Sequence, residues 1–202
     1  MTRDDDIAYV RALAEEGRRA PLLSGPVLVA AAVIFGGASL LQWAVQTGVW
    51  AVNPWAQLWI WIGAGVLFGA ALALICARMR RKPGYNSVSN TAVGAAWSGI
   101  GFLIFTVWLS LVAMGVRTGD WSAMQMMPSL VFAAYGAAWT VASAMSGQKW
   151  INAVALASYG GAVLLGVFTG QPAGYLVFVV LLFGVVLIPG LVLMRRERAE
   201  VG

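Results

Sequence analysis

The sequence predicts an all-α membrane protein, a six-transmembrane-helix bundle with a short N-terminal amphipathic helix. First, 60% of the 202 residues are hydrophobic and only 10% are charged, whereas a soluble domain carries about 25% charged residues. Second, the chain contains six apolar runs, each near the roughly 20 residues that a helix needs to cross a bilayer. Third, Lys and Arg cluster directly beside these runs, as they do at the cytoplasmic ends of membrane helices.

Residues 1–20 are expected to form a cytoplasmic amphipathic helix. Three aspartates come first, where carboxylates meet the positive end of a helix dipole. Arg18 and Arg19 end the segment and suit a bilayer surface. The narrow apolar stripe is compatible with lying on lipid, packing under the bundle or receiving a soluble partner, and we interpret it as a surface-lying anchor. Its members recur at helical spacing: Ile7, Val10, Leu13 and Ala14.

Residues 21–202 form the predicted transmembrane domain, a single bundle. The second span is the clearest, since Asn53 and Pro54 suit a helix start and a basic cluster ends it. Pro189-Gly190 is expected to bend or loosen the last span. The six spans are predicted at about 26–45, 55–77, 91–116, 124–145, 150–168 and 174–194.

Charge predicts the orientation of the bundle. When the second span ends inside, every one of the thirteen Lys and Arg residues except Arg117 falls on the cytoplasmic side, as the positive-inside rule requires. Both termini are then cytoplasmic. The net charge of +5 sits next to apolar spans, which favours anionic lipid headgroups over nucleic acid as the counter-charge. Eight cations are candidates for contacting headgroups or a docking partner: Arg18, Arg19, Arg78, Arg80, Arg81, Lys82, Arg195 and Arg196.

Small residues predict where helices approach closely, because membrane helices associate through close packing. The tetrapeptide Gly-Ala-Ala-Trp occurs at 94–97 and 136–139, in two antiparallel spans. We expect the two glycine faces to meet, with Trp97 and Trp139 on the flanks of the contact. The candidate packing residues are Gly65, Gly69, Gly94, Ser98, Gly136, Thr140, Ala157 and Gly161.

The chain lacks most of the groups that catalysis requires. It has no histidine and one cysteine, Cys76, and no Asp, Glu, Lys or Arg lies inside a predicted span. A His-ligated metal or haem is therefore excluded, and a thiolate cluster cannot form. Proton-coupled transporters usually carry an ionisable group at membrane depth. We expect no enzyme activity, no metal and no cofactor.

Neutral polar and aromatic residues remain inside the spans. They are compatible with simple interhelical hydrogen bonds and aromatic packing. A sharper interpretation makes four of them the wall of a pocket for an apolar or cationic amphiphilic ligand, namely Trp97, Tyr135, Trp139 and Tyr159.

Residues Asp5–Pro26, DDIAYVRALAEEGRRAPLLSGP, resemble the start of small uncharacterised bacterial six-span inner-membrane proteins. The resemblance implies a multi-pass protein of the bacterial inner membrane and no particular activity.

Together these observations predict a non-catalytic accessory or sensor protein that docks a cytoplasmic or membrane partner through its basic inner face. The alternative is a transporter or channel for a small uncharged or amphipathic solute. Anionic lipids are the other expected partners, and a homo-oligomer is compatible with the sequence.

Overall fold

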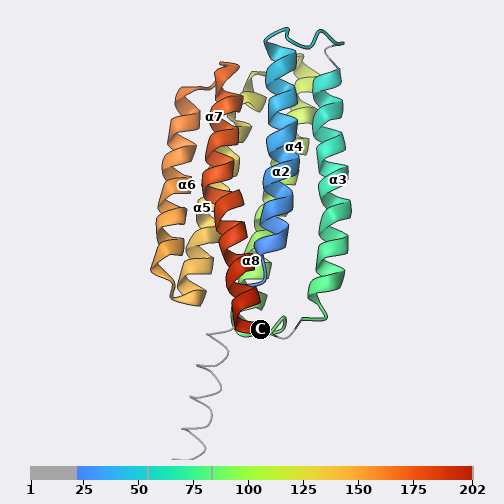
Figure 1. Ribbon diagram of the computed structural model, residues 1–202. Coiled ribbons are helices and arrows are strands. Elements are labelled where there is room, and N and C mark those ends of the chain that lie inside the picture. The colour runs from blue at the N-terminus through green and yellow to red at the C-terminus, as the bar shows by residue number, and fades with distance from the viewer. Residues whose placement is uncertain (1–21, 54, 83, 202) are drawn as a thin grey trace, which may run out of the picture.

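The computed structural model describes residues 22–53, 55–82 and 84–201, and over these residues the protein is an all-α bundle (Figure 1). Six of its helices are long and apolar enough to cross a membrane, which confirms the predicted fold class. The expected amphipathic helix at 1–20 lies outside the described residues.

Helix boundaries follow local chemistry. Ser87 accepts a hydrogen bond from the Asn90 N–H at the start of α4, and Gly119, at φ +74°, ends that helix in the left-handed region. The Asn53 side chain accepts a hydrogen bond from the Trp55 N–H just before α3. The elements are α2 (Gly25–Gln46), α3 (Ala56–Met79), α4 (Val88–Thr118), the 3₁₀ turn η1 (Ser122–Met126), α5 (Met127–Ser146), α6 (Lys149–Val167), α7 (Ala173–Leu182), the π-helical turn η2 (Phe183–Leu187) and α8 (Ile188–Val201).

Neighbouring helices follow one another around the bundle in the order α3, α2, α7–α8, α6, α5, α4. The helices α3 and α4 are consecutive in sequence, yet α3 packs chiefly on α2 and α4 on α5. The core lies among the other four spans, where Phe132, Trp139 and Leu182 are fully buried. The centre of the described bundle is therefore filled with side chains.

The sixth span changes its helical winding just before Pro189. Proline has no N–H to offer the carbonyl four residues earlier, so an ordinary α-helix would leave Val185 without its partner. The structure replaces this turn with η2, in which the Ile188 N–H bonds to the Phe183 carbonyl, five residues back. The predicted irregularity at Pro189-Gly190 therefore takes the form of a π turn.

Two glycines bring α2 and α8 together at the end of the bundle where the described chain begins. A Cβ added to Gly25 would lie 2.8 Å from the Gly190 carbonyl oxygen, and one added to Gly190 would lie 3.1 Å from the Gly25 oxygen. Because real Cβ atoms essentially never lie within 3.0 Å of a non-bonded atom, position 25 requires glycine, whereas a side chain at position 190 would need its neighbours to shift by a few tenths of an ångström. The sequence analysis did not single out this contact.

The predicted meeting of the two Gly-Ala-Ala-Trp faces is wrong. A Cβ on Gly94 would meet nothing within 4 Å, whereas one on Gly136 would lie 2.6 Å from the Tyr159 ring of α6. Helices α4 and α5 meet instead through aromatic rings, with Trp97 and Trp139 edge to face at 5.4 Å. Because these rings occupy the interface, the glycine face of α4 turns outward.

The remaining candidate packing residues divide between contact and exposure. Gly161 lies against Phe132 and Leu181, and Thr140 bonds to the carbonyl of Gly136 in its own helix. At Gly65 and Gly69 an added Cβ would meet nothing within 4 Å. Ser98 and Ala157 are exposed.

Candidate functional site: the basic end of the bundle

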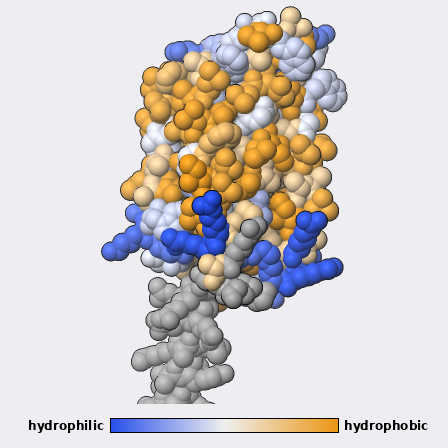
Figure 2. All heavy atoms as spheres, viewed as in Figure 1, coloured by the Kyte–Doolittle hydropathy of each residue, from blue (hydrophilic) through white to orange (hydrophobic). Residues whose placement is uncertain are grey.

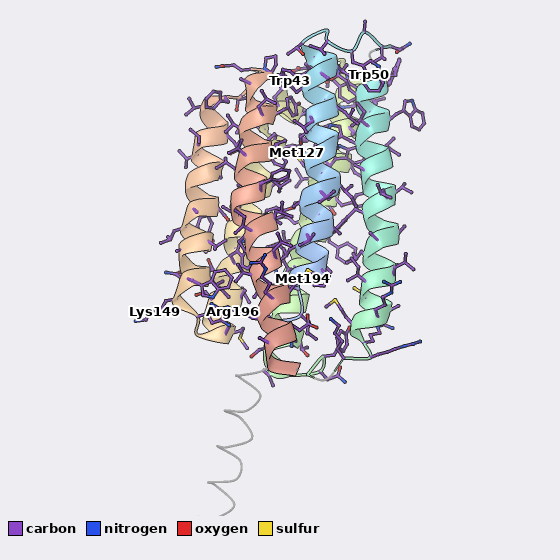
Figure 3. All side chains as sticks on the ribbon, viewed as in Figure 1. Trp43, Trp50, Met127, Lys149, Met194 and Arg196 are labelled. Atoms are coloured by element: carbon purple, nitrogen blue, oxygen red, sulfur yellow. The ribbon has the colours of Figure 1, made fainter. Side chains whose placement is uncertain are left out.

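Strongly hydrophilic side chains, blue in Figure 2, collect at one end of the bundle below its apolar surface, and most cations of the described chain gather there. We call this the basic end. The opposite end carries one described cation, Arg117, and exposed tryptophans that include Trp50 and Trp55. Figure 3 shows this separation, with Trp50 at one end and Lys149 and Arg196 at the other. The described cations of the basic end are Arg78, Arg80, Arg81, Lys82, Lys149, Arg195 and Arg196.

Helix α8 holds the loops of the basic end together. Glu197 forms an ion pair with Lys82, which lies just beyond the end of α3. The adjacent Arg196 donates from Nη1 to Gln148 Oε1 at 2.6 Å, in the connection between α5 and α6. The end of α8 is thereby fixed to two loops that are distant in the sequence.

The described chain begins inside the basic end. Leu22 and Leu23 are buried, each 3% exposed, and the Leu23 N–H donates to Asn90 Oδ1 at 3.0 Å. The Asn90 side chain also donates to the Gly84 carbonyl at 3.0 Å. One amide side chain thus joins the first described residues to the connection between α3 and α4.

The basic end is poor in compensating negative charge. Among the described side chains it holds seven cations and one carboxylate, Glu197, which pairs with Lys82. The other cations are exposed. An electropositive surface of this kind attracts acidic groups through long-range fields and loses strength in salt.

The structure brings together the described members of the predicted docking set, while Arg18 and Arg19 lie outside the described residues. In the structure Gln148 and Trp150 also contact a member of this set, Arg196, although the sequence analysis did not name them. The available signal was a tryptophan directly after the polar turn at 146–149. Their partner Arg196 is too distant in sequence for periodicity to pair them.

The predicted aromatic pocket divides in two. Trp97, Tyr135 and Trp139 pack on one another, with the Trp97–Tyr135 centroids 5.6 Å apart, and they fill the interface between α4 and α5. Tyr159 instead covers Gly136 on the α6 side and is 40% exposed. The indole N–H groups of Trp97 and Trp139 are buried without a partner in the described part of the chain.

A small polar cavity lies at the opposite end. It has a volume of about 30 Å³, which holds roughly two waters at 10–15 Å³ each. Drug-sized ligands occupy about 300–1,000 Å³. Nearby, Gln46 Nε2 lies 3.5 Å from the Tyr175 hydroxyl, and Gln42 donates to Gln57 at 2.6 Å. The polar lining comes from Gln46, Gln125, Thr169, Gln171 and Tyr175.

Asp120, in the connection between α4 and η1, is the one described carboxyl at this end. Its pKa lies below the ordinary value because the backbone N–H and the hydroxyl of Ser122 hydrogen-bond to the carboxylate. The Ser122 N–H donates to Asp120 Oδ1 at 2.8 Å. This carboxylate therefore stabilises a turn.

Comparison with protein-family models, curated proteins and solved structures finds no match for this chain. Among the described residues, the basic end carries more charged side chains than the opposite end, which holds Arg117 and Asp120.

Proposed function

We propose that this chain is a non-catalytic integral membrane protein, an accessory or sensor subunit whose basic end docks a cytoplasmic or membrane partner. The observation that carries the proposal is the set of exposed cations without an ionic partner among the described residues. Such a surface fits a partner with an acidic face, because complementary charge speeds encounter and sets orientation.

The filled centre of the bundle supports docking over transport. Phe132, Trp139 and Leu182 are fully buried in the core, and the polar cavity at the opposite end has room for about two waters. A carrier for a larger solute needs a cavity near the membrane midplane. In the described part of the chain, these core positions are occupied by packed side chains.

The proposal places the protein in a bacterial inner membrane with both termini in the cytoplasm. The separation of cations from exposed tryptophans supports this orientation, since Lys and Arg favour cytoplasmic loops. Reporter fusions at Lys82, Arg117, Lys149 and Gly202 test it. A periplasmic signal at Lys82 or Gly202 would reverse the orientation and remove the docking face from the cytoplasm.

Cross-linking in cells followed by purification tests the docking itself. The test variant replaces Arg78, Arg80 and Arg81 with Gln, and the control is Arg117→Gln at the opposite end. We expect specific cross-linked products with the wild type and the control, and their loss from the triple variant and at high salt. Equal products from all three proteins would overturn the proposal.

Deletion of residues 2–19 extends the same experiment to the N-terminal segment. We expect the deletion to weaken the same cross-links. A monomer that forms no product and moves a solute into proteoliposomes would support the transporter alternative instead.

A further inference from the structure

At one corner of the basic end, neighbouring side chains fix the orientation of the Arg196 guanidinium. Arg196 donates from Nη1 to Gln148 Oε1 at 2.6 Å, and its guanidinium carbon lies 5.2 Å from the centre of the Trp150 ring. The Trp150 Nε1–H donates to the same Gln148 oxygen at 2.6 Å. Hydrogen bonding and a cation–π contact therefore orient Arg196 before any ligand arrives.

Within the described part of the chain, the same corner retains unused donors and positive charge. A guanidinium has five N–H donors, and the hydrogen bond to Gln148 occupies one of them. Arg195 and Lys149, the sequence neighbours of Arg196 and Gln148, are both exposed. Glu197 is committed to Lys82, so it does not neutralise Arg196.

The corner lies where the apolar surface of the bundle ends. Trp150 is partly buried against the hydrophobic core, at the second residue of α6. Lys149, Leu156 and Val163 are spaced by seven residues and share one face of α6, and Leu156 and Val163 are 64% and 73% exposed. A cation thus stands at the end of an exposed apolar strip.

The geometry points to a binding site for an anionic phospholipid, with its phosphodiester at Arg196 and Lys149 and an acyl chain along Leu156 and Val163. The planar donors of arginine match phosphate oxygens, and basic sites between membrane helices bind anionic headgroups. The apolar strip favours a lipid over an acidic protein, which would contact the cations alone. Lipid binding at this site requires no docked partner, so it can be tested independently of the proposed function.

The test uses the full chain in nanodiscs of phosphatidylcholine, with and without phosphatidylglycerol. The readout is the shift in thermal midpoint caused by phosphatidylglycerol, together with the phosphatidylglycerol retained in native mass spectrometry. We expect Arg196→Gln to lower the affinity about tenfold, the scale of one hydrogen bond to a charged group. Comparing lipids within each variant separates binding from any change in basal stability.

Arg80→Gln is the matched control, because it removes the same charge from the same end. We expect it to keep most of the phosphatidylglycerol effect. Equal losses in Arg80→Gln and Arg196→Gln would reveal only a general surface charge and overturn the site. Soluble glycerol phosphate added to phosphatidylcholine nanodiscs should give little shift, and a shift equal to that of phosphatidylglycerol would exclude a role for the acyl chain.

Discussion

The bundle contains two kinds of membrane helix. In the spans formed by α2, α5, α6 and α7–α8, between 33% and 44% of the most apolar stretch of 18 residues is buried inside the protein, whereas the share is 6% in both α3 and α4. The two groups are similarly rich in small residues, but glycines at which an added Cβ would meet another residue are more frequent in the first group. In the second group Gly115 of α4, which lies against the Trp121 ring, is the exception. Gly136 meets a tyrosine ring, and Gly94 meets nothing within 4 Å.

This difference shows that a small residue permits close packing without creating it. A glycine becomes a contact when a bulky group or another backbone fills the space that it leaves. A Cβ added to any glycine of helix α3 would meet no such group within 4 Å among the described residues. The ties of α3 to α2 include the Gln42–Gln57 hydrogen bond at 2.6 Å and the Phe35–Phe68 ring pair at 5.2 Å.

The largest effect is expected at the contact between α2 and α8. Gly25→Leu would place a side chain against the Gly190 carbonyl, and backbone cannot rotate out of the way as a side chain can. We expect destabilisation at or above the upper end of the usual overpacking range, about 3 kcal/mol. Thermal or denaturant unfolding in nanodiscs measures it.

The control for this prediction is Gly37→Leu in the same helix, where an added Cβ would meet nothing within 4 Å. Similar losses at both positions would show that the cost arises from replacing any glycine of α2 with leucine, and that the close approach to α8 is not its cause.

A smaller effect is expected at the contact between α5 and α6. Gly136→Leu should destabilise the bundle by about 1–3 kcal/mol, because the Tyr159 ring occupies the space but is exposed enough to move partly aside. Gly94→Leu changes the equivalent residue of the other Gly-Ala-Ala-Trp segment and should leave the unfolding midpoint nearly unchanged. If the two variants unfold alike, the contrast between the packed and the peripheral helices is wrong.

A modest effect is expected where α3 is attached. Interhelical hydrogen bonds in membranes contribute about 0.6 kcal/mol. Gln42→Leu should therefore weaken the free energy of packing between α3 and α2 by about that amount. A double-mutant cycle with Gln57→Leu isolates the coupling, and faster hydrogen exchange confined to α3 locates it. A coupling near zero would show that the two amides do not hold the helices together.

The smallest effect concerns the turn that leads from α4 towards α5. Since the folded pKa of Asp120 is lowered, its contribution to stability is present above the unfolded pKa of about 3.9 and is lost as pH falls through the folded value. We expect the protection of the Ser122 amide against hydrogen exchange, measured relative to the intrinsic exchange rate at each pH, to fall as the pH drops below about 4, and Asp120→Asn to abolish this pH dependence. An unchanged pH profile in that variant would assign the effect to another group.

Hydropathy and length were sufficient to predict the six spans, because the apolar residues that place a span in lipid all lie within one continuous stretch of sequence. Contacts between spans were harder to predict. The contact between Gly25 and Gly190 joins residues far apart in the sequence. No periodicity in the sequence indicates how one helix is rotated about its axis relative to its neighbour. Trp97 and Trp139 were predicted on the flanks of a glycine contact. Their large rings instead fill the interface between α4 and α5 and keep the two glycine faces apart. The helix at 1–20 stays a prediction.

The Gly25–Gly190 contact also sets an order of events during biosynthesis. Among the described helices α2 is made first, whereas α7 and α8, which pack against it, are made last. At about 5–20 residues per second, α8 follows α2 by roughly 10–30 s. During this interval α3 is the main native neighbour that α2 can pack against among the described helices. A ribosome that stops before Gly190 therefore leaves the first span without the backbone surface that completes it, and such chains are the expected substrates of membrane quality control.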